Sequence, residues 1–275
     1  MYKRVLTIQD ISCVGQCSLT VALPIISACG IETAVLPSAV LSTHTAGFSG
    51  FTVRDLAGDM QGICDHWVKE KITFDGIYTG YLGSIEQIDT VKDIVNKTIK
   101  KGAPFIVDPA MADNGKLYPA FNLEYANKMK ELASICDYLI PNITEACYLT
   151  DMEYKEEYDE SYINKLTDKL LSLGAKCIVL TGVSYSKGKT GVLVATNAHT
   201  SYYEHDKLPN SCHGTGDIYA SAFVGALLNG KAPEEAAKIS ADYTVSCIEE
   251  TAKVDNHWYG ACFELAIPKL ISMLK

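Results

Sequence analysis

Residues 211–223 read "SCHGTGDIYASAF", a turn with two glycines followed directly by an acid and an apolar segment. The pattern predicts a buried helix that begins near Thr215 or Gly216 and ends at Gly230. Backbone N–H groups at a helix start lack intrahelical acceptors, and glycines allow close approach, so the turn can bind an anionic oxygen. Asp217 can then be a general base beside that anion or a carboxylate that caps the helix. The stretch alone leaves phosphoryl transfer and plain capping both open.

Upstream of this turn, short β-rich runs alternate with amphipathic helical segments. The expected strands are "RVLTIQ" (4–9), "ETAVLPS" (32–38), "DGIYTG" (75–80), "PFIVDP" (104–109), "YLIPN" (138–142) and "KCIVLTG" (176–182). Apolar spacing predicts helices over 85–99 and 162–173, with Gly102 and Gly174 just past their ends. Repeated β-α-β units predict an α/β fold with a mainly parallel central sheet and helices on both faces. We expect one domain spanning residues 1–275.

The pattern changes after Gly174. Residues 189–209, "KTGVLVATNAHTSYYEHDKLP", predict two antiparallel strands at the far edge of the sheet. The chain then reaches the glycine-rich turn and finishes with two further helices, one starting at Pro233. The acid-rich segment 151–162 is interpreted as a solvated loop that leads into the next helix, with a domain linker as the alternative.

Composition excludes several classes of protein. A chain of 275 residues with 48% hydrophobic residues is globular, and a net charge of -9 without clustered Lys or Arg argues against nucleic-acid binding. No apolar run approaches bilayer length, and the first ten residues lack a signal-peptide core, so we expect a cytoplasmic protein. The ten scattered cysteines are expected to be reduced, and Cys13 and Cys17 lack the second pair of a zinc site.

Polar residues follow most of the expected strands. In open parallel sheets ligands bind beyond the carboxyl ends of the strands, so these residues predict a site there. Carboxylates in such places suit Mg²⁺ beside phosphates, and the candidates are Asp108, Asp113 and Glu145. The chain has no G-x-x-x-x-G-K-S/T loop and no G-x-G-x-x-G after its first strand, which argues against a P-loop or dinucleotide fold. The acids therefore favour phosphoryl transfer over plain capping.

Several motifs together resemble the pyridoxal kinases of the ribokinase-like superfamily. They are "IQD" (8–10), "LSTHTAGF" (41–48), "TGYLGS" (79–84), "VDPAM" (107–111), "IPNITEACYL" (140–149) and "HGTGD" (213–217). "GTGD" and "PN..E" are typical of the superfamily, whereas "STHT" and "GYLGS" point to the vitamin B6 kinases. The resemblance implies one α/β domain, a homodimer, that moves the γ-phosphoryl of MgATP to the 5′-hydroxymethyl of pyridoxal, pyridoxine or pyridoxamine.

The resemblance also implies roles for residues in the phosphoryl-transfer site. Asp217 would remove the proton from the alcohol, and Asp108 and Glu145 would organise the metal. The anion-binding amides would come from Gly214, Thr215 and Gly216. Residues near the nucleotide phosphates would be Asn142, Glu145, Thr181, Gly182 and Asp113, the last facing the phosphates or a monovalent cation such as K⁺ or Na⁺.

A second group of residues matches the vitamer pocket. Thr45 and Tyr81 would line the pyridine ring, and Tyr118 would belong to a flap over it. His44 would pack beside the ring or serve as a structural hydrogen-bonding histidine. Many relatives have Ser where this chain has Asp10, and we predict that Asp10 pairs with a polar atom of the ring, such as a protonated pyridine nitrogen.

Two rival interpretations remain open at the level of the sequence. The hydroxymethylpyrimidine kinases of thiamine synthesis share the Gly-Thr-Gly turn but often carry Cys at the position of Asp217. A non-catalytic vitamer- or nucleotide-binding protein could use the same scaffold. The presence of Asp217, Asp108 and Glu145 favours an enzyme, because a binding protein has no need of a base.

Overall fold

A computed structural model describes residues 2–209 and 212–275 of the chain. Over these ranges the protein forms a nine-stranded sheet in which six neighbouring strands, β9-β8-β5-β4-β1-β2, pair in parallel. The order across the sheet is β11 (Thr200–Asp206), β10 (Lys189–Thr196), β9 (Cys177–Val183), β8 (Tyr138–Leu139), β5 (Phe105–Val107), β4 (Gly76–Thr79), β1 (Arg4–Ser12), β2 (Glu32–Leu41) and β3 (Val53–Asp55). The predicted α/β class, the mainly parallel sheet and the antiparallel β10–β11 edge are confirmed.

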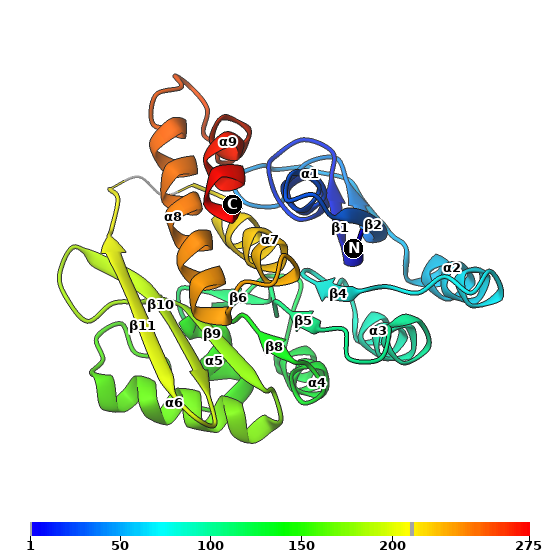
Figure 1. Cartoon of the computed structure of the whole chain (residues 1–275), viewed down its shortest axis with the longest axis horizontal. Helices are drawn as coiled ribbons and strands as arrows, with labels where there is room; N and C mark the ends of the chain where they lie inside the picture. Colours follow the sequence, from blue (N-terminus) through cyan, green and yellow to red (C-terminus); the bar gives the residue numbers. More distant parts are fainter. Residues whose placement is uncertain (1, 210–211) are drawn as a thin grey trace.

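Helices cover both faces of the sheet (Figure 1). One layer consists of α1 (Leu19–Ala28), α7 (Thr215–Leu228), α8 (Pro233–Thr251) and α9 (Phe263–Leu274). The opposite layer consists of α2 (Ala57–Lys69), α3 (Ile85–Thr98), α4 (Leu123–Ala133), α5 (Ile143–Thr150) and α6 (Glu160–Leu173). α7 is the central helix of its layer, and its side chains are buried nearly all round, as expected for a helix that packs between a sheet and other helices.

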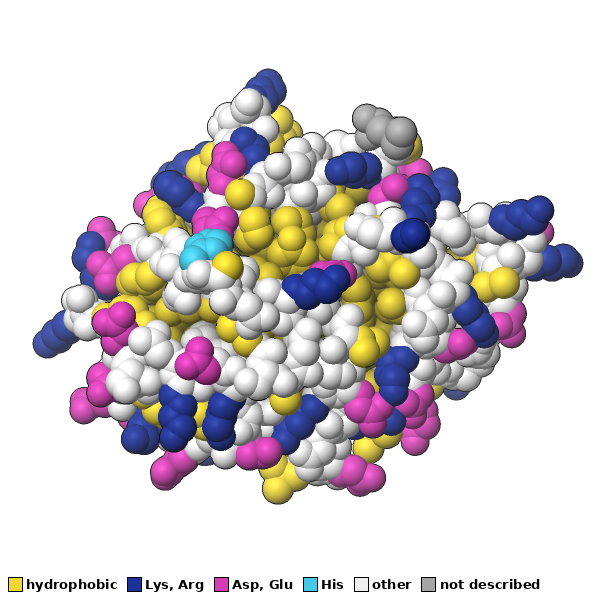
Figure 2. All heavy atoms as spheres, turned by 60° about the horizontal axis from the view of Figure 1, so that its bottom comes forward, with side chains coloured by type: hydrophobic (Ala, Val, Ile, Leu, Met, Phe, Trp, Pro, Cys, Tyr) yellow, Lys and Arg dark blue, Asp and Glu magenta, His cyan; other side chains and the backbone are white. Residues whose placement is uncertain are grey.

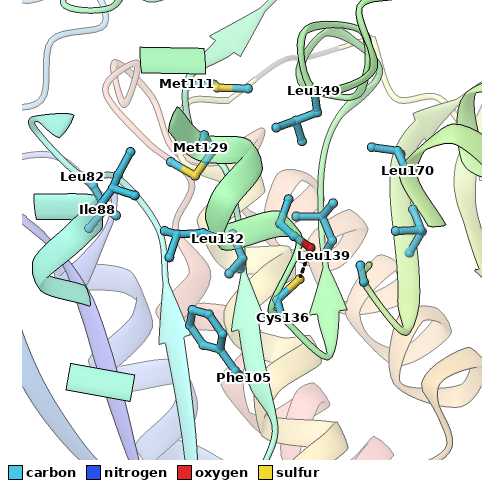
Figure 3. Close-up of a cluster of buried hydrophobic side chains, with 14 of the residues drawn as sticks. Leu82, Ile88, Phe105, Met111, Met129, Leu132, Cys136, Leu139, Leu149 and Leu170 are labelled. Atoms are coloured by element: carbon cyan, nitrogen blue, oxygen red, sulfur yellow. Dashed lines mark hydrogen bonds between the residues drawn. The ribbon is translucent and has the colours of Figure 1, made fainter. Parts of the chain in front are cut away.

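Each layer closes over its own hydrophobic core. Figure 3 shows part of the core beneath α3, α4 and α5, where Phe105 from β5 and Leu139 from β8 meet Met129 and Leu132 from α4. The Cys136 thiol donates a hydrogen bond of 3.4 Å to the carbonyl oxygen of Ala133 in the same cluster. Burial of this kind stabilises the fold by roughly 25 cal/mol per Å² of apolar surface. The two cores pack against opposite faces of the sheet and hold it in place. The loops at the carboxyl edge of the strands extend from this packed sheet.

The boundaries that differ from the sequence prediction include those of β1 and α3. β1 does not end before Asp10 but continues to Ser12 through a register shift between Gln9 and Ile11, so Asp10 lies inside the strand and is only 4% exposed. α3 ends at Thr98, because Ile99 is extended and forms a parallel bridge with Phe74. Tertiary pairing overrides the local pattern at both places.

The acid-rich segment 151–162 is a loop only in its first part. α6 begins at Glu160, and the Asp159 carboxylate caps it by accepting a 2.8 Å hydrogen bond from the N–H of Tyr162. The last three residues of the segment are therefore helical, which corrects the prediction of a loop through residue 162. A Ser, Thr, Asp or Asn directly before a helical pattern is the usual signal for such a start.

The surface mixes charges of both signs. Figure 2 shows one face of the molecule, on which Lys and Arg side chains alternate with Asp and Glu around a hollow where hydrophobic side chains gather. This face carries no broad basic patch of the kind that nucleic-acid binding requires. None of the helices in the described part of the chain is both long and apolar enough to cross a lipid bilayer.

Candidate active site

Four acids converge at the carboxyl edge of the parallel strands. Asp10 comes from β1, Asp108 follows β5, Glu145 lies in the first turn of α5, and Asp217 lies in the first turn of α7. Burial raises the pKa of Asp108 well above its usual range, and the nearby Glu145 and Asp217 raise it further. The structure thus brings together residues that are more than 200 positions apart in the sequence.

Asp217 has the properties of a base that works near neutral pH. Burial raises the pKa of its carboxyl to about 7, the neighbouring Asp10 adds to this rise, and the N–H of Ser18 opposes it. A general base is most effective when its pKa lies near the working pH. The position of Asp217 at the start of α7 also places it next to the first-turn amides, which have no acceptor within the helix.

The turn before α7 requires glycine at its first position. Gly214 is the N-cap residue with φ 78°, and a Cβ added there would lie 1.9 Å from the carbonyl oxygen of Gln16. Within the described residues no side chain caps α7, so the amides of its first turn keep their hydrogen-bonding capacity. Thr215 donates its hydroxyl to the Cys212 carbonyl at 3.4 Å. At Gly216 an added Cβ would meet no described atom within 4 Å, which leaves room for a ligand.

Asp108 and Glu145 are unequal candidates for holding a metal. The Glu145 carboxylate accepts hydrogen bonds from the N–H groups of Met111 (3.0 Å, at Oε1) and Asn142 (2.9 Å, at Oε2), and burial raises its pKa to about 7. Within the described residues, Asp108 accepts one hydrogen bond, from the N–H of Ala110 to Oδ1 at 3.1 Å, and its Oδ2 accepts none. Asp108 is therefore better placed for direct coordination, and Glu145 for binding through water or by charge alone.

The charge balance around these acids suits a divalent cation. None of the ion pairs formed within the described ranges involves one of the four acids. Clustered carboxylates without a basic partner are stabilised when a hard cation with oxygen ligands binds beside them. Among residues 2–209 and 212–275 no three His, Cys, Asp or Glu side chains form a ready metal cluster, Cys13 and Cys17 included. A metal here would thus need ligands from water or substrate.

Asn142, Thr181 and Gly182 lie side by side where β8 and β9 end. Asn142 caps α5: its Oδ1 accepts from the Glu145 N–H at 2.9 Å, while its Nδ2 donates to the Ala112 carbonyl at 2.8 Å. Thr181 forms an isolated parallel β-bridge with Asn142. Its hydroxyl donates a hydrogen bond of 3.3 Å to the Pro141 carbonyl. Gly182 is exposed and has φ 75°. The Asn142 side chain therefore holds local structure, and the exposed Gly182 remains open to a ligand.

A small hairpin carries Asp113 and leads to Tyr118. It consists of β6 (Ala112–Asp113) and β7 (Lys116–Leu117), and sequence analysis did not foresee it. The signal was present, because Asn114 and Gly115 both have positive φ, and Asn-Gly is the preferred pair for a two-residue hairpin turn. Asp113 is exposed. Tyr118 is 37% exposed as a residue, and burial of its hydroxyl, followed by the charges of Glu145 and Asp108, raises the pKa of Tyr118.

Two of the predicted vitamer-pocket residues, Tyr81 and His44, lie near Asp10. Burial and then the nearby Asp10 raise the pKa of Tyr81 to about 12, and its ring centroid lies 5.3 Å from that of Phe121. His44 is 4% exposed, and both its nitrogens are occupied: Nδ1 accepts from the Ala46 N–H (3.1 Å) and Nε2 lies 2.6 Å from the Tyr259 carbonyl oxygen. These contacts favour the structural role of His44. Thr45 is exposed on the same loop.

Sequence reasoning overlooked two serines that contact Asp10. Ser12 donates its hydroxyl to Asp10 Oδ2 at 3.0 Å, and the hydroxyl of Ser18 lies against the same carboxyl. Burial raises the pKa of Asp10, and the two hydroxyls oppose this rise. The Ser12 contact could have been predicted from the sequence. At a bulge in a strand, a hydroxyl two residues after an acid can donate to that acid. The Ser18 contact depends on the path of the loop before α1 and could not have been predicted from the sequence.

Asp217 should make stability depend on pH. Its pKa is higher in the folded protein (about 7) than its ordinary value of 3.8, so the folded state binds the proton more tightly and gains stability as pH falls through that window. Asp217→Asn removes the charge that is costly above pH 7. We expect the variant to melt several degrees above wild type at pH 8, with the difference shrinking at pH 5. Thermal melts of both proteins without ligand test this, and equal Tm values at pH 8 would contradict it.

Comparison with known proteins shows the class and family of the chain. The chain is a phosphotransferase that acts on an alcohol group. A sequence model of the phosphomethylpyrimidine kinases matches residues 25–261, so the chain belongs to the phosphomethylpyrimidine kinase family.

The relatives also confirm the resemblance to pyridoxal kinases and the ribokinase-like fold. A pyridoxal kinase of Dictyostelium discoideum is 28% identical over 82% of this chain and 78% of its own length. A Bacteroides thetaiotaomicron protein assigned to the phosphomethylpyrimidine kinases and crystallised with pyridoxal is 32% identical, with a TM-score of 0.92 over 98% of this chain and 96% of that one. The pyridoxal kinase of Lactobacillus plantarum is 27% identical, with a TM-score of 0.91 over 99% and 98% of the two chains.

Proposed function

We propose that the protein transfers the γ-phosphoryl group of ATP to the 5′-hydroxymethyl group of a vitamin B6 vitamer, for salvage of pyridoxal 5′-phosphate. The observation that carries the proposal is the start of α7, where Asp217, with a pKa raised to about 7, stands beside the amides of the Gly214–Gly216 turn, which no described side chain caps. The names of the relatives, and the pyridoxal in one of their crystals, support the same substrate class.

In this proposal each part of the site has one task. Asp217 accepts the proton of the 5′-hydroxyl, and the amides of residues 214–216 hold the charge on the phosphoryl group as it moves. Catalysis of phosphoryl transfer depends mainly on alignment and charge stabilisation, which fixed amides and a fixed carboxylate provide. Thr45, Tyr81 and Asp10 bind the vitamer ring, and Tyr118 on the hairpin covers the site. Gly182, Thr181 and Asn142 border the nucleotide phosphates.

The proposal includes Mg²⁺, with Asp108 as the better-placed protein ligand and Glu145 acting through water. When bound, the ion neutralises charge on the nucleotide phosphates. Asp113, exposed at the hairpin, faces the phosphates or a monovalent cation. The acids of the site support this proposal, because their mutual repulsion raises the pKa of Asp108 and a bound cation would offset that repulsion.

A hydroxymethylpyrimidine kinase is the second candidate, because the matching family carries that description. A purified-protein assay of ADP release separates the two, with pyridoxal, pyridoxine, pyridoxamine, hydroxymethylpyrimidine and ribose as acceptors and a reaction without Mg²⁺ as control. We expect turnover with at least one B6 vitamer, little with the other two alcohols, and none without the metal. Faster turnover of hydroxymethylpyrimidine than of every vitamer would reverse the assignment, and no turnover of any acceptor would favour a binding protein.

Asp10 is expected to set the preference among vitamers. A carboxyl that is 4% exposed, with Ser12, Ser18 and His44 as its described polar neighbours, can pair with the ring nitrogen of pyridine. Losing a hydrogen bond to a charged group costs about 1.5–3 kcal/mol, so Asp10→Ser should lower kcat/KM by about 10- to 100-fold for the favoured vitamer. The relative kcat/KM values of the three vitamers should also change. Proportional loss for all three would remove Asp10 from ring recognition.

Two further expectations are a homodimer, which the resemblance implies, and a cytoplasmic location, which follows from the sequence composition and the cysteines. All ten cysteines lie in described parts of the chain and are free thiols, which supports a reducing compartment. Light scattering of the purified protein tests the dimer.

A further inference from the structure

Ser18 adopts a backbone conformation that serine rarely takes. It precedes α1 as the N-cap residue, with φ 54° and ψ -128°. Side chains with a Cβ are strained at positive φ, whereas glycine is not. Strained residues persist where the surrounding structure holds them, and they are concentrated at functional sites. The other positive-φ residues of the described chain that are not glycine include Lys71, in an exposed turn after α2, which provides a comparison outside the site.

The Ser18 hydroxyl is not used as a helix cap. Serine is favoured at an N-cap because its oxygen can accept from the amides of the first turn, yet the described structure gives α1 no side-chain cap. The main chain of Ser18 still begins the helix, since its carbonyl accepts from the N–H groups of Val21 (3.0 Å) and Ala22 (2.8 Å). The hydroxyl instead lies against the Asp10 carboxyl, and both residues are nearly fully buried, at 6% and 4% exposed.

The position of Ser18 places it between the two acids of the proposed reaction. An isolated antiparallel bridge pairs Ser18 with Ile11, the residue after Asp10. On the other side, the turn before α7 packs onto the same segment: a Cβ at Gly214 would lie 1.9 Å from the Gln16 carbonyl oxygen and 3.4 Å from the Cys17 sulfur. The N–H of Ser18 faces the Asp217 carboxyl. One residue thus meets Asp10 with its hydroxyl and Asp217 with its main-chain amide.

We propose that Ser18 is a positioning residue that holds Asp10 and Asp217 in register, so that an alcohol bound at the first acid is presented to the second. The inference rests on the proposed function, because it assumes that the two acids serve one bound substrate. The strained backbone is what allows both contacts, since φ sets the direction of the Cβ relative to the N–H and a negative φ would separate the two contacts. Ser12 alone would then remain as a hydroxyl donor to Asp10.

Two variants separate the strain from the hydroxyl contact. Ser18→Ala keeps the strained Cβ and removes the hydroxyl, whereas Ser18→Gly removes both the hydroxyl and the strain. We expect kcat/KM for pyridoxal to fall by about 10- to 100-fold in both variants, the range for losing a hydrogen bond to a charged group. We also expect Ser18→Gly to melt about 2–4 °C above Ser18→Ala. A merely structural serine would give the opposite pattern, with the more stable glycine variant retaining wild-type kcat/KM.

Lys71→Gly is the control, because Lys71 also has a positive φ (56°) but lies at an exposed turn. It should raise Tm without changing kcat or KM. A double-variant cycle then asks whether Ser18 acts through Asp10: in an Asp10→Asn background, Ser18→Ala should lower kcat/KM by no more than about 2-fold further. Losses that multiply in the double variant would overturn the proposal, as would wild-type kcat/KM in both single variants.

Failure of the proposed function gives a different result from failure of this inference. Absence of wild-type turnover with every B6 vitamer defeats the proposed function, and the Ser18 cycle is then measured with whichever alcohol of the acceptor panel is phosphorylated. Normal wild-type turnover combined with unaffected Ser18 variants defeats the inference alone.

Discussion

Asp217→Asn is expected to lower kcat by about 10²- to 10⁴-fold, the range for loss of a general base. The asparagine side chain has nearly the same shape as aspartate, but its amide cannot accept the proton of the alcohol. KM for ATP should change only a few-fold, because the amides of the Gly214–Gly216 turn belong to the backbone and stay in place. Steady-state kinetics with pyridoxal and a thermal-shift titration with MgATP measure the two quantities separately.

Asp151→Asn is a suitable control for this substitution. Asp151 is an exposed carboxylate that ends α5 in a left-handed conformation, which asparagine also tolerates. The control should retain wild-type kcat. If Asp217→Asn stays within a few-fold of wild type as well, another group removes the proton and the proposed base is wrong.

Gly214→Ala is the substitution with the second-largest expected effect. The added Cβ would meet the Gln16 carbonyl oxygen at 1.9 Å, and the residue would have to keep φ 78°. The clashing oxygen belongs to the main chain of Gln16, in the segment that leads to Ser18, and cannot rotate away as a side chain could. The clash must therefore be relieved by moving the turn before α7. Displacing an anion-binding amide costs about 10²- to 10³-fold in kcat, so we expect a loss of at least that order together with a lower Tm.

Gly230→Ala isolates the effect of the clash. Gly230 follows α7 with φ 90°, and an added Cβ would have no described atom within 4 Å. This variant carries only the cost of positive φ, about 1 kcal/mol, and should keep wild-type kcat. Equal kcat and equal Tm for the two alanine variants would show that the turn before α7 tolerates displacement and does not hold the phosphoryl group.

The parts of the fold that the sequence predicted are those fixed by local pattern. α7 runs from Thr215 to Leu228 with Gly230 beyond it, close to the helix expected from the apolar run. The antiparallel β10–β11 edge was likewise visible as two β-rich runs. Where long-range pairing decides the outcome, local pattern was insufficient: Asp10 lies within β1 because the strand continues past a register shift against β2.

In the candidate site, too, local motifs were predicted from the sequence and contacts between separate loops were not. The motifs located Asp217, Asp108 and Glu145, and the fold brings them together. The sequence could not reveal that both oxygens of Glu145 already accept main-chain hydrogen bonds, one from Met111 in a different loop. Nor could it reveal that Ser18 turns its hydroxyl away from α1 toward Asp10. Such facts depend on how separate loops meet at the sheet edge, which no single segment specifies.

A crystal structure of the protein with pyridoxal and a non-hydrolysable ATP analogue tests the central claim most directly. We predict that the terminal phosphate lies against the amides of residues 214–216, with the 5′-oxygen of pyridoxal within about 2.6–3.2 Å of the Asp217 carboxylate. A terminal phosphate bound away from the start of α7, or a 5′-oxygen that points away from Asp217, would contradict the account.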